Sequence, residues 1–324
     1  MRADLLKAIA AGLTSALFYA SVLSGSLFAV ILVWLAPAPL FFAGLTLHVR
    51  GAIIAAAAGT AAIAVAGNPA TALAYALSNA VAPIILCRFA LLSRSYINND
   101  SQPQTEWYPA GLLFAVLCVL AGLFVAGGAV YSLSQPEGLR GVIATFVDID
   151  GLAAAITQMQ MQTGGNVLDE TALRAMLPVI ALLSVAVAWV LSMIASGALA
   201  QAMAQRFGPS LRPSPGLANL QLPRWLNFIL LASIIATFLP GTAGLAASAI
   251  AVIFTVPYFF LGLSTVHVIS RRLPARPAVL TVFYVLMFFF SWLILLTVGL
   301  GLTEQFAGFR QKAIAAQTGK GQGD

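Results

Sequence analysis

Charged side chains are scarce in this chain, where lysine and arginine together number 16 and aspartate and glutamate number 10 among 324 residues. About a quarter of the residues of a soluble domain are charged, so 8% charged and 60% hydrophobic residues exclude a water-soluble fold. None of the acidic residues falls in the middle of an apolar run. This absence argues against a proton-coupled pump and against a metal site built from carboxylates.

Cysteines and catalytic motifs are also few. The two cysteines, Cys87 and Cys118, lie inside apolar runs and have no partners at metal-ligand spacing, so we interpret them as small buried hydrophobic residues. The sequence lacks an HExxH motif, paired aspartates, a glycine-rich phosphate loop and a convincing serine, histidine and aspartate set. We therefore expect no enzymatic activity, no cofactor and no bound metal.

Apolar runs of about 20 residues recur along nearly the whole chain, which is the pattern of bilayer-spanning helices. They predict an all-α polytopic transmembrane bundle with about eight spans, eight or nine depending on how the short piece 40–47 is counted. The lipid bilayer is then the main partner of the chain. The predicted spans are 8–34, 51–66, 70–92, 109–133, 175–203, 226–239, 243–268 and 278–302.

Basic residues gather at the ends of these runs rather than on one face, which favours membrane orientation over nucleic-acid binding. Arg2 and Lys7 predict a cytoplasmic N-terminus. The longest polar insertion, 137–174, is acidic, so we place it outside the cytoplasm. Its apolar positions recur at helical spacing and predict amphipathic helices broken at 164–165.

Two prolines interrupt the first apolar region and mark the candidate ligand site. Pro37 and Pro39 remove backbone donors where lipid offers no replacement, and transporters place binding sites at such breaks. His48 and Arg50 follow the break, and Asn79 is an amide inside an apolar run. These five residues are the candidate ligand-binding set. The alternatives are a positive-inside anchor for Arg50, an interfacial position for His48 and an interhelical hydrogen bond for Asn79.

A stripe of small residues, Ala8, Gly12, Ala16 and Ala20, recurs at four-residue spacing along the first span. Such a stripe lets another helix approach closely. One interpretation is a docking face for a membrane protein partner. The other is a packing seam within the chain.

These features, with the segment that ends at Arg50 and the closing run 299–306 into Arg310, resemble the uncharacterised bacterial integral-membrane proteins of the YybS-like family, a domain of unknown function. That family is in turn distantly similar to the S components of energy-coupling-factor transporters. The resemblance implies an S-component-like bundle over 1–204. The chain departs from that pattern in the acidic insertion 137–174, which lies within this bundle, and in three further spans over 205–302. The composition of 303–324 predicts an interfacial helix and a disordered tail. The resemblance also implies a location in the bacterial inner membrane.

Two functions follow from this reading. The first is a transporter subunit that binds a small molecule or lipid-like ligand, with ATP-binding subunits supplied separately because no phosphate loop is present. The second is a membrane scaffold or regulator that binds other proteins.

Overall fold

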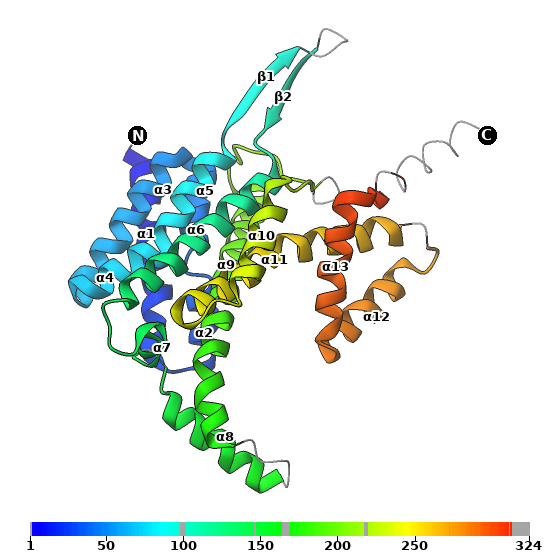
Figure 1. Ribbon diagram of the computed structural model, residues 1–324. Helices are drawn as coiled ribbons and strands as arrows, with labels where there is room; N and C mark the ends of the chain where they lie inside the picture. Colours follow the sequence, from blue (N-terminus) through cyan, green and yellow to red (C-terminus); the bar gives the residue numbers. More distant parts are fainter. Residues whose placement is uncertain are drawn as a thin grey trace.

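The computed structural model describes residues 2–97, 102–145, 147–163, 169–216, 220–271, 273–310 and 312. In this part of the chain, α-helices form a bundle from which one β-hairpin projects (Figure 1). Within the described ranges, six helical segments are long and apolar enough to cross a membrane, and three shorter apolar helices accompany them. The predicted all-α polytopic bundle is confirmed.

The first predicted span, 8–34, is wrong because the chain breaks in its middle. Gly25 adopts a left-handed conformation with φ of 61° after a short 3₁₀ turn, and the Ser26 side chain accepts a hydrogen bond from Ala29 N at 3.2 Å. A left-handed glycine ends one helix and a serine cap starts the next. The N-terminal elements are α1 (Arg2–Ala20), η1 (Ser21–Ser24), α2 (Leu27–Trp34), α3 (Ala38–Ala66), α4 (Pro69–Tyr75), the π-helical turn η2 (Ala76–Ala80) and α5 (Val81–Ala90).

Helix α3 consists of two halves that meet at Leu47 and His48, where the backbone leaves the helical conformation. A Cβ added to Gly51 would lie 2.7 Å from the carbonyl oxygen of Ala43. Residues eight apart in a straight helix are separated by about 12 Å along the axis, so the second half must turn back along the first. The chain therefore reverses direction after the short piece 40–47.

The polar stretch after α5 forms an antiparallel hairpin of β1 (Ser93–Ile97) and β2 (Pro103–Trp107), with Ser93 opposite Trp107. The hairpin projects from the end of the bundle that carries the N-terminus (Figure 1). It leads into α6 (Ala110–Ser132), which returns through the bundle.

The acidic insertion is helical, as predicted. It contains α7 (Gly138–Ala144), α8 (Ile149–Thr163) and the start of the long α9 (Glu170–Phe207), while the break expected at 164–165 lies outside the described residues. Arg174 on α9 forms an ion pair with Asp150, which links α8 to α9, and a second one with Glu170 of its own helix. Helix α8 projects from the end opposite the hairpin (Figure 1).

Four helices follow among the described residues: α10 (Trp225–Ala236), α11 (Gly241–Ser270), α12 (Arg276–Phe289) and α13 (Trp292–Ala307). The prediction of one span over 278–302 is wrong, because the helix breaks at Phe290, whose φ and ψ are −119° and 90°. Helices α12 and α13 form a V beside the rest of the bundle (Figure 1). Gly262 and Gly301 bring α13 against α11, since a Cβ on either would clash with the facing backbone. The predicted disordered tail beyond residue 312 lies outside the described residues.

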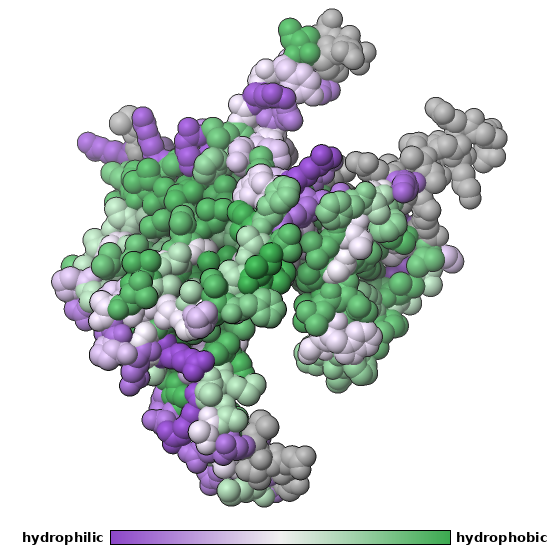
Figure 2. Space-filling view, viewed as in Figure 1, coloured by the Kyte–Doolittle hydropathy of each residue, from purple (hydrophilic) through white to green (hydrophobic). Residues whose placement is uncertain are grey.

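Figure 2 shows how polarity is distributed over one face of the molecule. Hydrophobic residues cover the middle of the bundle and the α12–α13 pair, while hydrophilic residues gather near the N-terminus, on the hairpin and around α7 and α8. An apolar middle between two polar ends is the surface expected of a protein surrounded by lipid.

Candidate functional site

A cavity of about 360 Å³ lies between the first half of α3 and helices α5, α6, α9 and α11. Its wall is almost entirely apolar. The loop that follows α9 closes one end of it and contributes Arg212, Ser214 and Pro215. The principal apolar residues of the wall are Phe41, Leu86, Leu113, Phe114, Met193 and Phe260.

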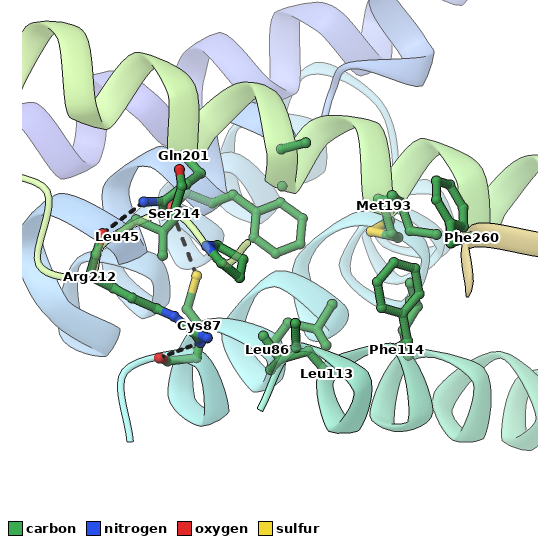
Figure 3. A pocket seen from close by; sticks show the side chains of 18 residues that line it. Leu45, Leu86, Cys87, Leu113, Phe114, Met193, Gln201, Arg212, Ser214 and Phe260 are labelled. Carbon is green, nitrogen blue, oxygen red and sulfur yellow. Dashed lines mark hydrogen bonds between the residues drawn. The ribbon is translucent and has the colours of Figure 1, made fainter. Parts of the chain in front are cut away.

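The polar residues of the cavity lie together at one end. Figure 3 shows Gln201 and Arg212 at this end and Met193, Phe114 and Phe260 at the other. The Gln201 side-chain amide donates a hydrogen bond to the Arg212 carbonyl oxygen at 2.8 Å, which ties the loop to α9. The cavity is therefore amphipathic along its length.

Arg212 is 5% exposed, although it lies in a loop. Its Nη1 donates to the carbonyl oxygen of Ala90 at 2.8 Å and its Nη2 to that of Tyr108 at 2.7 Å. Ala90 is the last residue of α5, and a cation at a helix C-terminus is favoured by the helix dipole. Burial lowers the pKa of the Arg212 guanidinium from its ordinary value, but arginine stays charged in proteins.

The same loop also caps the broken α3. The backbone N–H of Leu211 donates to the carbonyl oxygen of Leu45 at 3.2 Å, close to the point where the first half of α3 ends. A helix that ends leaves carbonyl groups without intrahelical partners. The loop satisfies one of them and so fixes the polar end of the cavity against α3.

A family model described as "Predicted membrane protein (DUF2232)" matches residues 12–304. The chain belongs to this family. The matched range includes every residue that lines the cavity of this DUF2232 protein. No curated protein and no solved structure matches the chain. The prediction of an uncharacterised membrane protein family is thus confirmed, while the likeness to S components stays a prediction.

Side-chain hydroxyl groups bond the backbone carbonyl groups at the proline break of the DUF2232 chain. The Ser192 hydroxyl of α9 donates to the carbonyl oxygen of Trp34 at 2.6 Å, and the Ser15 hydroxyl of α1 donates to that of Ala36 at 2.6 Å. Both carbonyl groups lie where the helix is interrupted, so the hydroxyls replace the lost helical bonds. Pro37 is fully buried and Pro39 half-buried, and neither lines the cavity.

The other three candidate residues lie apart from the cavity as well. His48 and Arg50 are exposed at the turn between the halves of α3, where His48 has a φ of 63° that favours glycine. Asn79 is buried in the π-helical turn, and its side-chain amide donates to the hydroxyl of Ser78 at 2.7 Å. The indole nitrogen of Trp189 donates to the Ser78 carbonyl oxygen at 2.7 Å, so this turn is bonded to α9.

The small-residue stripe lies against the second half of α3. Ala8, Gly12 and Ala16 are buried and Ala20 is half-buried, and a Cβ on Gly12 would clash with the carbonyl group of Ala55. The stripe therefore forms a packing seam within the chain. Docking of a partner protein on α1 stays a prediction.

Sequence reasoning missed the cavity because its wall comes from five helices and a loop that are distant along the chain. In the sequence, Arg212 is one of several basic residues at the ends of apolar runs. No local pattern distinguishes it from its exposed neighbour Arg224. Among the described residues, no group of three or more histidine, cysteine, aspartate or glutamate side chains is placed to hold a metal ion.

Proposed function

We propose that this membrane protein binds an amphipathic, lipid-like molecule in the cavity that Arg212 lines at one end. The observation that supports this most is the arrangement of the wall, which is apolar along its length and polar at one end. Ligand sites are typically cavities of about 300–1,000 Å³ with an apolar lining and a few convergent polar groups. A hydrocarbon tail fits the apolar part, and a polar head fits the end with Gln201 and Arg212.

The proposed setting is the bacterial inner membrane, with the N-terminus and the β-hairpin in the cytoplasm. Arg2 and Lys7 belong to the start of α1 and Arg94 to the hairpin, at the same end of the bundle (Figure 1). Asp150 and Glu170 lie at the other end, near α8. Basic residues are enriched on the cytoplasmic side of membrane proteins, and this bias supports the orientation.

A subunit of a transporter, as the S-component resemblance implies, is one role that such binding would serve. The second candidate is a membrane scaffold or regulator that binds other proteins. The hairpin and α8 favour it, because they project beyond the two ends of the bundle, where soluble partners could reach them (Figure 1). The scaffold requires no molecule in the cavity, so occupancy of the cavity distinguishes the two functions.

The test uses a glycine that lines the cavity. A Cβ on Gly197 would lie 3.8 Å from the ring of Phe41, so Gly197→Leu would place a side chain inside the cavity. Gly127→Leu is the matched control, because a Cβ on Gly127 of α6 would meet nothing within 4 Å. Native mass spectrometry of the purified proteins measures the bound molecules.

We expect the wild type and Gly127→Leu to retain an amphipathic molecule through detergent exchange. Gly197→Leu should retain about tenfold less, since overfilling a packed site costs about 1–3 kcal/mol. If Gly197→Leu retained as much of the molecule as the wild type, the molecule would bind outside this cavity. A wild type that carries no such molecule, and that no added fatty acid or phospholipid stabilises against heat, would overturn the proposal.

A further inference from the structure

Arg212 brings a positive charge to the polar end of the cavity that no described acidic residue neutralises. The side chain is 5% exposed, and no carboxylate of the described ranges lies within 4.0 Å of its guanidinium. Burying a charge is costly unless it is paired. The carbonyl oxygens of Ala90 and Tyr108 accept its hydrogen bonds, but they carry no net charge.

The other buried arginine of the described residues is paired differently. Arg310, which is 8% exposed, has the Glu304 carboxylate 2.9 Å from its Nε. The helix dipole at the end of α5 supplies only about half a negative charge to Arg212. Arg310 has a carboxylate partner and Arg212 has none among the described residues. This difference indicates that a bound molecule supplies the negative charge opposite Arg212.

Because Arg212 lines the cavity, a negative charge that pairs with it would lie at the polar end of the cavity. The side chain belongs to the wall of the cavity, at the end opposite Met193, Phe114 and Phe260 (Figure 3). Ala110, the first residue of α6, lines the same cavity. A helix N-terminus favours negative charge, because its first backbone N–H groups have no intrahelical acceptors.

We propose that the molecule bound in this cavity is an amphipathic anion, whose carboxylate or phosphate head lies against Arg212 and whose hydrocarbon tail lies along the apolar wall. This inference rests on the proposed function, because it requires the cavity to hold a lipid-like molecule. A fatty acid and an acidic phospholipid both offer this chemistry. The experiment therefore includes one arm for each source.

The full-length protein is placed in nanodiscs of phosphatidylcholine, and its thermal unfolding is followed during titration with laurate or with lauryl alcohol. The two probes have the same tail, so they differ in the charge of the head. In a parallel arm, phosphatidylglycerol replaces part of the phosphatidylcholine. We expect laurate, phosphatidylglycerol or both to stabilise the protein, and lauryl alcohol to bind about tenfold more weakly than the anion, as the loss of a charge-assisted hydrogen bond implies.

Each outcome has a distinct meaning. Stabilisation by laurate alone identifies a carboxylate head, and stabilisation by phosphatidylglycerol alone identifies a phosphate head. Equal binding of laurate and lauryl alcohol, without an effect of phosphatidylglycerol, would overturn the anionic head and leave the proposed function standing. If none of the three probes binds, and native mass spectrometry finds no retained molecule, the proposed function fails as well.

Variants of Arg212 test its part in recognition. Arg212→Gln should weaken binding of the anionic probe about tenfold and binding of lauryl alcohol by a clearly smaller factor, whereas Arg212→Lys should retain part of the preference for the anion. Arg224→Gln is the matched control, because Arg224 is exposed in the same region. A folded Arg212→Gln protein that binds the anion as tightly as the wild type would overturn the assignment. Should Arg212→Gln fail to fold, the comparison of probes on the wild type still decides the charge of the head.

Discussion

Ser15 stabilises the proline break at the level of a single side chain. It has no exposed surface, and its hydroxyl donates to the carbonyl oxygen of Ala36 at 2.6 Å and lies 2.7 Å from the hydroxyl of Tyr75. In Ser15→Ala the buried Ala36 carbonyl would lose its partner, which costs about 1–3 kcal/mol. We expect the free energy of unfolding to fall by that amount, as measured by thermal unfolding in detergent.

The neighbouring hydroxyl supplies the control for this prediction. Thr14 donates to the carbonyl oxygen of Ala10 within its own helix at 2.9 Å, so Thr14→Ala leaves that carbonyl in its helical bond. Thr14→Ala should change the free energy of unfolding by no more than about 0.5 kcal/mol. Equal losses of stability in the two variants would show that Ser15 does not support the break.

The breaks between elements could be predicted only where special residues mark them. Pro37 marks the break that follows α2. Gly25 followed by Ser26 is a typical pair of helix-ending and helix-starting residues, but the pair lies inside a long apolar run that hydropathy alone predicts as one span. At Phe290 no glycine or proline is present, so hydropathy alone predicts one continuous helix. The cavity could not be predicted because it exists only after α3, α5, α6, α9 and α11 have packed together.

An ion pair at the end of α13 positions Arg310, whose other hydrogen bonds fasten this end to the rest of the bundle. Arg310 pairs with Glu304, and it also donates to the hydroxyl of Ser264 on α11 at 3.1 Å and to the carbonyl oxygen of Leu220 at 2.6 Å. Glu304→Gln would remove the carboxylate that pairs with the buried guanidinium. Breaking such a pair costs about 3–5 kcal/mol, so we expect a large fall in the thermal unfolding midpoint.

An exposed ion pair offers the comparison. Arg94 and Glu106 lie 2.7 Å apart across the β-hairpin, with 79% and 49% of their side chains exposed. Exposed pairs contribute about 0–1 kcal/mol, so Glu106→Gln should change stability little. If Glu304→Gln were as stable as Glu106→Gln, the contact at the end of α13 would not hold the C-terminal helices in place.

The two ends of the bundle differ, and the polar end of the cavity lies near only one of them. The loop that carries Arg212 follows α9 at the end that also carries the N-terminus and the hairpin (Figure 1). A bound anion would therefore have its head near the proposed cytoplasmic surface and its tail within the bilayer. This arrangement depends on the orientation of the bundle, which labelling can measure independently of any ligand.

The labelling experiment begins from a chain with Cys87→Ala and Cys118→Ala, in which a single cysteine is introduced at either end. Ser95→Cys places it on the exposed hairpin and Met161→Cys on the exposed face of α8. In intact spheroplasts, a membrane-impermeant maleimide should label Met161→Cys and spare Ser95→Cys, and it should label both after the membrane is opened. If Ser95→Cys were labelled and Met161→Cys spared, the bundle would have the opposite orientation, with the head of the ligand near the outer surface. Labelling of both cysteines from outside would contradict the placement of the hairpin and α8 at opposite ends.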